Sequence, residues 1–309
     1  MDVSSLQAKL DEANYICGSE VATTLLVALQ LGRPLLIEGP AGVGKTEIAK
    51  VMASALDREL VRLQCYEGLD ESKALYEWNY QKQLLSIQVQ MNRRDADELT
   101  RSLFSGEYLL ERPLLRAIRS EKPVVLLIDE IDKSDEEFEA FLLELLSEMQ
   151  VTIPESGVIR ASSIPFVILT SNRTRPLGEA LRRRCAYLYL QYPDIRRETE
   201  IIKAKRPNVS DRLALQVAQA IHDLRESERI LKKPSIAETL DWISALEALG
   251  ISDLTPEAAR QTMGFVLKSS EDLESAPEVL DHPGHDGGCG CGHEHGHDHD
   301  HCGCGHHHA

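Results

Sequence analysis

The chain has 309 residues, of which 42% are hydrophobic, and a formal net charge of −16. This length suits one large or two smaller folded domains, and the apolar content is ordinary for a globular protein. The acidic balance argues against duplex nucleic acid as a general partner, because negative charge repels phosphate backbones. No run of about 18 apolar residues predicts a membrane span, and no basic-then-apolar leader opens the chain. Cys17, Cys65 and Cys185 are scattered singly, as in a reducing compartment, so we expect a cytoplasmic protein.

Apolar runs that resemble strands alternate with helical stretches in the first two thirds of the chain. After a helical lead-in over residues 1–34, these runs are 35–39, 60–65, 124–129 and 165–171. Such alternation predicts an α/β fold, with a parallel sheet covered by helices on both faces. Beyond Pro193 the periodicity is helical throughout, and from about residue 276 it ends. We therefore expect an αβα domain over residues 1–192, a small all-helical domain over 193–275 and a tail over 276–309.

The first strand-like run leads directly into GPAGVGKT, which has the GxxxxGK[ST] spacing of a phosphate-binding loop. The residues of this loop are Gly39, Pro40, Ala41, Gly42, Val43, Gly44, Lys45 and Thr46. Glycines let backbone N–H groups surround phosphate oxygens, and the N-terminus of the following helix favours negative charge. We expect Lys45 to contact the β- and γ-phosphates and Thr46 to place its hydroxyl on Mg²⁺. A chance glycine-rich turn is the alternative, which the strand-loop-helix context disfavours.

Polar residues end two of the later apolar runs. Asp129 and Glu130 follow one run, and Asn172 follows the next. Because ligands of parallel sheets bind at the carboxyl ends of strands, we expect Asp129 to hold Mg²⁺ through water. Glu130 would polarise the attacking water and Asn172 would orient it. Each residue could instead be a solvated strand exit or a turn former, but their order after a phosphate loop favours the catalytic roles. The lack of an Asn-Lys-x-Asp guanine motif favours ATP.

These segments resemble the AAA+ ATPases, and specifically their MoxR branch. The likeness is carried by three stretches: GPAGVGKTEIAK, LLIDEIDKSDEEFEAFLLELLSEMQVTIPESG and FVILTSNRTRPLGEALRRRC. A further stretch, RLQCYEGLDESKALYEWNYQKQLL, resembles the MoxR-type ATPases that accompany maturation of carbon monoxide dehydrogenase and related molybdenum hydroxylases. The resemblance covers roughly residues 10–260 and leaves the tail uncovered.

The resemblance implies an AAA+ P-loop domain, a helical lid and a ring that is usually a hexamer. It also implies a partner protein with a von Willebrand factor A domain and an apo-metalloenzyme client. A neighbouring subunit's arginine would complete the ATP site, and Arg184 is the best match to it, with Arg183 second. A solvated basic helix end is the alternative for these arginines. Residues 86–110 lie where this branch carries an insert, and any client contact there is an analogy.

The lid departs from the family pattern in one respect. Related lids carry an arginine in a Gly-Ala-Ser-Pro-Arg-like motif that contacts the γ-phosphate, whereas this chain has LKKPSIAETLDW. Glu238 lies near the expected position, and Lys232 or Lys233 is the remaining candidate for a substitute. How the lid senses ATP is therefore open.

The tail is rich in soft metal ligands separated by glycine. Its candidate ligands are His285, Cys289, Cys291, His293, His295, His297, His299, His301, Cys302 and Cys304. It lacks the apolar residues that would offset the entropy of ordering, so we expect it to be disordered without metal. Cys-x-Cys spacing is too narrow for an ordinary structural zinc site, and the mixed ligands suit exchangeable Zn²⁺, Ni²⁺ or copper. A tethered metal reservoir is one interpretation, and a general metal buffer or a low-complexity extension is the other.

Three functions compete at this point. The first is an ATP-hydrolysing remodelling chaperone that assists assembly of a metal centre in a metalloenzyme. The second is a metallochaperone, in which ATP gates the storage or delivery of metal from the tail. The third is a nucleic-acid motor or loader, which the net charge of −16 disfavours.

Overall fold

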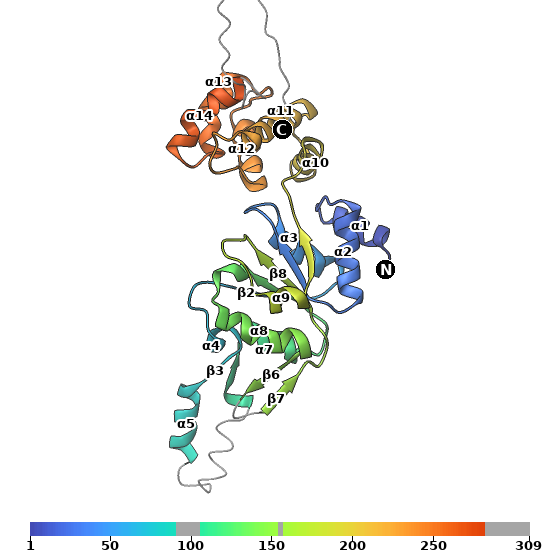
Figure 1. Ribbon diagram of the computed structural model, residues 1–309, viewed down its shortest axis with the longest axis vertical. Helices are drawn as coiled ribbons and strands as arrows, with labels where there is room; N and C mark the ends of the chain where they lie inside the picture. The colour runs from blue at the N-terminus through green and yellow to red at the C-terminus, as the bar shows by residue number, and fades with distance from the viewer. Residues whose placement is uncertain (91–105, 154–156, 282–309) are drawn as a thin grey trace, which may run out of the picture.

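The computed structural model describes residues 1–90, 106–153 and 157–281 (Figure 1). A parallel sheet with strand order β2-β5-β8-β1-β9 lies at its centre. The strands are β1 (Leu35–Glu38), β2 (Leu60–Gln64), β5 (Val125–Asp129), β8 (Phe166–Ser171) and β9 (Ala186–Tyr189). All four pairs of neighbours are parallel, which confirms the predicted α/β fold class.

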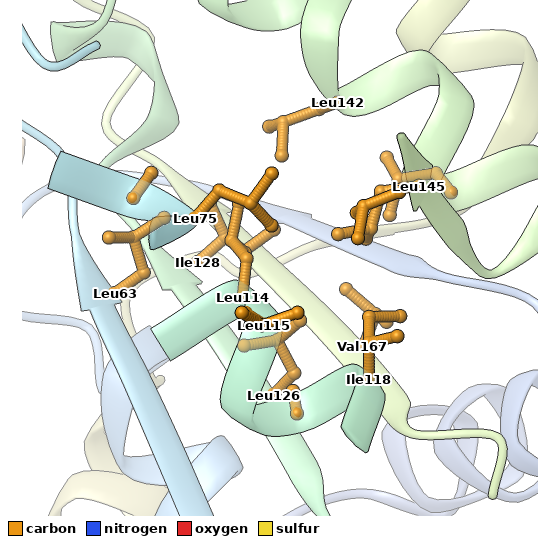
Figure 2. Close-up of a cluster of buried hydrophobic side chains, with 14 of the residues drawn as sticks. Leu63, Leu75, Leu114, Leu115, Ile118, Leu126, Ile128, Leu142, Leu145 and Val167 are labelled. Carbon is orange, nitrogen blue, oxygen red and sulfur yellow. The ribbon is translucent and has the colours of Figure 1, made fainter. Parts of the chain in front are cut away.

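Alternate residues of the central strands face two separate cores, as the two-residue period of a strand requires. Leu126 and Ile128 of β5 join one core, whereas Val125 and Leu127 join the other. The first core is closed by α7 (Pro113–Arg119) and α8 (Glu136–Glu148), and Figure 2 shows Leu114 and Leu142 among its side chains. The second core is closed by α1 (Val3–Glu12), α2 (Ser19–Gln30) and α3 (Lys45–Ala55). Burial on both faces explains why these strands read as continuous apolar runs.

Two small antiparallel hairpins extend this domain. One pairs β3 (Tyr76–Trp78) with β4 (Leu109–Glu111), and the other pairs β6 (Gln150–Ile153) with β7 (Gly157–Arg160). The shorter elements between these strands are α4 (Glu71–Ala74), α5 (Tyr80–Gln90), η1 (Gly106–Tyr108), η2 (Ile131–Lys133) and α9 (Glu179–Arg184). Figure 1 shows α5 projecting away from the sheet, beyond the β3–β4 hairpin.

The remaining helices pack around a third core that contains the buried Trp242. They are α10 (Ile195–Lys205), α11 (Asp211–Glu226), α12 (Ile236–Ala248), α13 (Pro256–Thr262), η3 (Met263–Phe265) and α14 (Ser270–Asp281). The change from sheet to helices falls between β9 and α10, whereas the expected boundary at 275/276 falls inside α14. This helix continues to Asp281 because Ala276 and Val279 bury their side chains in the third core. Across the described ranges, no helix is both long and apolar enough to span a bilayer.

Candidate active site

The phosphate loop connects β1 to α3 and depends on its glycines. Gly44 caps α3 with φ = +92°, and Gly42 has φ = +73°, a region that glycine enters without strain. A Cβ atom on Gly39 would lie 2.2 Å from the backbone oxygen of Leu190, and one on Gly42 would lie 2.2 Å from the Cβ of Ser235. At these two positions the backbone is therefore packed against Leu190 and Ser235 too closely for a side chain.

Lys45 lies in the first turn of α3 with only 6% of its surface exposed. Its Nζ donates hydrogen bonds to the carbonyl oxygens of Gly39 at 2.8 Å and Pro40 at 2.6 Å. Burial lowers the pKa of this ammonium, although the carboxylates of Asp132, Asp129 and Glu130 oppose the shift. The loop's own carbonyls thus hold the positive charge inside the turn.

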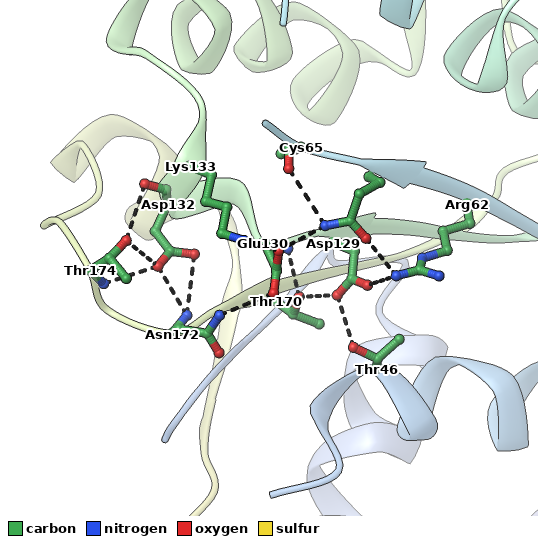
Figure 3. A network of polar contacts seen from close by, with 11 residues as sticks. Thr46, Arg62, Cys65, Asp129, Glu130, Asp132, Lys133, Thr170, Asn172 and Thr174 are labelled. Atoms are coloured by element: carbon green, nitrogen blue, oxygen red, sulfur yellow. Dashed lines mark hydrogen bonds and ion pairs between the residues drawn. The ribbon is translucent and has the colours of Figure 1, made fainter. Parts of the chain in front are cut away.

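Asp129 ends β5 at the carboxyl edge of the sheet and is 2% exposed. Figure 3 shows the network around it. Its Oδ1 accepts hydrogen bonds from the hydroxyls of Thr46 at 2.9 Å and Thr170 at 2.5 Å. Its Oδ2 accepts one from Nη2 of Arg62 at 2.6 Å. The two residues expected to bind Mg²⁺, Thr46 and Asp129, are therefore in direct contact.

Glu130 follows with φ = +57°, a conformation that is uncommon for residues with a side chain and is frequent at functional sites. Its backbone N–H donates to the Thr170 hydroxyl at 2.9 Å. Its carboxylate accepts hydrogen bonds from Gln64 at 2.9 Å and from Asn172 at 3.3 Å. Lys133 adds an ion pair at 2.7 Å, and about a third of the Glu130 side chain is exposed. The carboxylate is thus held by three groups and is still open to solvent.

Asp132 anchors the segment that carries Asn172. It is 3% exposed, and its carboxylate accepts hydrogen bonds from the backbone N–H groups of Asn172 at 3.2 Å and Thr174 at 2.9 Å. The Thr174 hydroxyl donates a further one at 2.7 Å. Burial acts to raise the pKa of Asp132, but the hydrogen bonds from Thr174 and Asn172 outweigh it and leave the pKa below its usual value.

The arginines of α9 point in different directions. The Arg182 side chain is 42% exposed and donates to Oε1 of Glu38 at 3.1 Å, where Glu38 is the buried last residue of β1. Arg183 pairs with Glu179 at 2.6 Å and is three-quarters exposed. Arg184 is also exposed, and its Nε donates to the Ser147 hydroxyl at 2.5 Å. Both finger candidates therefore lie on the surface, and in the described structure they contact α8 and α9 rather than their own phosphate loop.

The N-terminus of α12 lies directly against the phosphate loop. The backbone N–H of Ile236 donates to the Gly42 oxygen at 3.3 Å. Glu238, near the position where related lids carry an arginine, accepts from the Ser235 backbone N–H at 2.7 Å in a capping box. The Lys233 ammonium donates to the Ser227 oxygen within the lid. Glu238 thus caps its own helix, and the lid contacts the loop through backbone atoms of α12.

The donor set fits a nucleotide with Mg²⁺. Hydroxyl and carboxylate oxygens, the ligands that Mg²⁺ prefers, converge from Thr46 and Asp129 beside the loop. The loop turns through Gly42 and Gly44, both at positive φ, into the N-terminus of α3, and a helix N-terminus favours phosphate oxygens. Among the residues the structure describes, no cluster of three or more His, Cys, Asp and Glu side chains forms a separate metal site. The candidate tail ligands, His285 to Cys304, lie outside the described residues.

Several residues of this network were not predicted from the sequence. Arg62 and Gln64 alternate with apolar residues on β2, and Thr170 lies inside the apolar run of β8. Asp132 lies two residues after Glu130, and this closeness to the Asp129-Glu130 pair is a sequence signal for a place in the same site. Strand register provides the missing information, because β2 and β8 both pair with β5.

The parallel sheet and the glycine loop between β1 and α3 together have the arrangement of a phosphate-binding α/β domain. Residues 34–185 match the family model of the AAA domain (dynein-related subfamily), from the residue before β1 to the end of α9. Domains of that family use ATP together with Mg²⁺.

Relatives of the chain include uncharacterized staphylococcal proteins. One from Staphylococcus saprophyticus is 24% identical over 87% of this chain and 96% of its own length. Another, from Staphylococcus haemolyticus, is 27% identical over 72% of this chain and 78% of its own length. Among solved structures, the Thermotoga maritima RuvB Holliday junction branch migration motor is 22% identical, with a TM-score of 0.47, and the match covers 84% of this chain and 72% of that one.

Proposed function

We propose that this protein hydrolyses ATP and uses the energy to remodel a protein client, as a MoxR-type AAA+ ATPase. The observation that supports it most is the convergence of Lys45, Asp129, Glu130 and Asn172 on one edge of the sheet, next to the phosphate loop. These residues come from three separate stretches of the chain.

In this proposal, each side chain has one task. The ammonium of Lys45 leaves the loop carbonyls for the β- and γ-phosphates of ATP. Thr46 and Asp129 hold Mg²⁺, which when bound offsets negative charge on the phosphates. Glu130 takes a proton from the attacking water, which Asn172 helps to orient through its contact with Glu130 at 3.3 Å.

The hydrolysing unit in this proposal is a ring, with hexamer as the expected size. Arg183 and Arg184 support it, because both are exposed and neither contacts its own phosphate loop in the described structure. A guanidinium offered to a neighbour's γ-phosphate would offset the charge that develops there. Analytical ultracentrifugation with ATP tests this step, since the monomer mass is 34.5 kDa and a ring is several times heavier.

The proposed client is an apo-metalloenzyme that has still to receive its metal centre, of the kind found in molybdenum hydroxylases. The proposed partner has a von Willebrand factor A domain. Support comes from the stretch RLQCYEGLDESKALYEWNYQKQLL and from the metal ligands of the tail. A tethered tail would raise the metal concentration near the bound client. In the alternative metallochaperone, ATP turnover would depend on metal in the tail.

A truncation after Asp281 separates these two functions, because it removes the tail and keeps all of α14. Full-length and truncated protein are dialysed against Zn²⁺, and then metal content and ATP turnover are measured. We expect the truncated chain to lose bound metal and keep its ATPase activity. Equal metal content in both would remove the tail as the metal site, and loss of ATPase activity on truncation would favour the metallochaperone.

A further inference from the structure

Arg62 makes a contact with the Asp129 carboxylate that the proposed mechanism does not use. It lies on β2, opposite Leu127 in the parallel register with β5. Its Nη2 donates to Oδ2 of Asp129 at 2.6 Å and to Oε1 of Gln64 at 2.5 Å (Figure 3). One nitrogen of the guanidinium thus links the end of β5 to the end of β2.

The Asp129 carboxylate has an uneven set of partners. Its Oδ1 is satisfied by two neutral hydroxyls, from Thr46 and Thr170, and Arg62 binds its Oδ2. In the described part of the chain, Arg62 is the one cationic side chain within salt-bridge distance of Asp129. A buried carboxylate needs such a counter-charge, because desolvation penalises an unpaired ion.

The two members of this ion pair differ in exposure. Asp129 is 2% exposed, whereas the Arg62 side chain is 49% exposed. Asp129 is fixed among the strands, but the guanidinium can move into solvent with little loss of packing. Because the guanidinium is half exposed, another cation can take its place at the carboxylate without leaving Asp129 unpaired.

We propose that Arg62 is a resident counter-ion of Asp129 that Mg²⁺ must displace when nucleotide binds. The inference rests on the proposed ATP site and adds that Arg62 and Mg²⁺ compete for Asp129 there. Both cations are attracted to the same buried carboxylate, so the Arg62 contact raises the Mg²⁺ concentration at which nucleotide binding is half-maximal.

The same guanidinium also fixes the side-chain amide of Gln64. Since Oε1 of Gln64 accepts from Arg62, its Nε2 is directed to the Glu130 carboxylate, at 2.9 Å. Displacement of Arg62 removes the partner of Oε1 and frees the amide to rotate. Mg²⁺ binding at Asp129 would therefore change the hydrogen bond that Gln64 donates to Glu130.

The test measures ADP binding by calorimetry at Mg²⁺ concentrations from chelator alone to saturation, so that hydrolysis plays no part. We expect Arg62→Ala to lower the Mg²⁺ concentration at half-maximal binding about fivefold, the scale of a weak ion pair. Arg62→Gln removes the charge but keeps most of the side chain and an N–H donor near Asp129, so the variant is less disruptive to folding. It should lower the Mg²⁺ concentration at half-maximal binding by a similar factor. Arg62→Lys keeps the charge and should shift the midpoint less.

Arg116→Ala is the matched control. It also removes one positive charge close to β2, but Arg116 pairs with exposed Glu59 at the surface. Equal midpoints for Arg62→Gln and Arg116→Ala would overturn the inference, because only net charge would then matter. If the wild-type protein binds no ADP at any Mg²⁺ concentration, the proposed site itself is wrong. If it binds normally and the Arg62 variants leave the midpoint unchanged, only the role of Arg62 is wrong.

Discussion

Asp132→Asn perturbs the site through a residue that contacts no substrate in the proposed mechanism. The carboxylate of Asp132 accepts from Asn172 N–H on both oxygens and from Thr174 on Oδ2. An asparagine can keep its oxygen toward Thr174, but its NH₂ group then lies opposite the N–H of Asn172. Two donors would face each other in a site that is 3% exposed.

The structure sets the scale of this effect. Losing one buried charge-assisted hydrogen bond and leaving a donor unsatisfied costs about 2 kcal/mol in the free energy of unfolding. For a domain of this size, that lowers Tm by about 4–8 °C. Asn172 must also move away from the new NH₂ group, and a small displacement of an orienting group slows a reaction by about 10- to 100-fold.

The assay combines thermal unfolding with steady-state ATP hydrolysis and ADP binding. Hydrolysis and Tm should fall, whereas ADP affinity should change little because the phosphate loop keeps its contacts. Asp135→Asn is the control, since Asp135 caps α8 by accepting from Phe138 N–H at 2.8 Å, and Asn caps helices as well as Asp does. Unchanged turnover and Tm in Asp132→Asn would refute the argument that this carboxylate positions Asn172.

Three further predictions concern charge at the site. Lys45→Ala should abolish ATP binding in calorimetry, because the phosphates lose their nearest cation, and retained affinity would contradict its role. The pKa of Asp132 is lowered on folding, so its stabilisation is complete above its unfolded pKa of about 4 and is lost as pH falls through the lower folded value. The difference in unfolding free energy between wild type and Asp132→Asn should accordingly stay constant from pH 7 to pH 5 and shrink below pH 4, and a difference that grows at low pH would reverse the sign of our argument. Arg184→Ala should hydrolyse ATP slowly, and mixing it with Glu130→Gln should restore part of the activity, because some shared sites then contain both residues; full activity of Arg184→Ala alone would point to Arg183 or to no arginine finger.

The centre of the sheet was predictable because β1, β5 and β8 are buried on both faces and read as apolar runs, whereas β2 alternates apolar and polar residues. Four of the five central strands were expected within one residue at each end. The fifth, β9, was not predicted; it is an edge strand on which Tyr187 and Tyr189 are exposed. The last helix, α14, was assigned in part to the tail, since Pro277 and its acidic residues mask the apolar positions that enter the third core.

The motif residues of the site were predictable from spacing, but their partners were not. Thr46, Asp129 and Glu130 belong to local patterns that are visible in one stretch of chain. The contacts of Arg62, Gln64 and Thr170 depend on which strands lie beside β5, which sequence spacing does not specify. The structure supplies that strand order, and with it the network in Figure 3.

ATP hydrolysis by Glu130→Gln tests the central proposal most directly. The substitution keeps an oxygen that can accept from Asn172 or Gln64, but it removes the base that would take a proton from water. We predict that the variant binds ATP as tightly as wild type in calorimetry and hydrolyses it at least about tenfold more slowly in single-turnover assays. Wild-type turnover in this variant would contradict the assignment of Glu130 as the catalytic base.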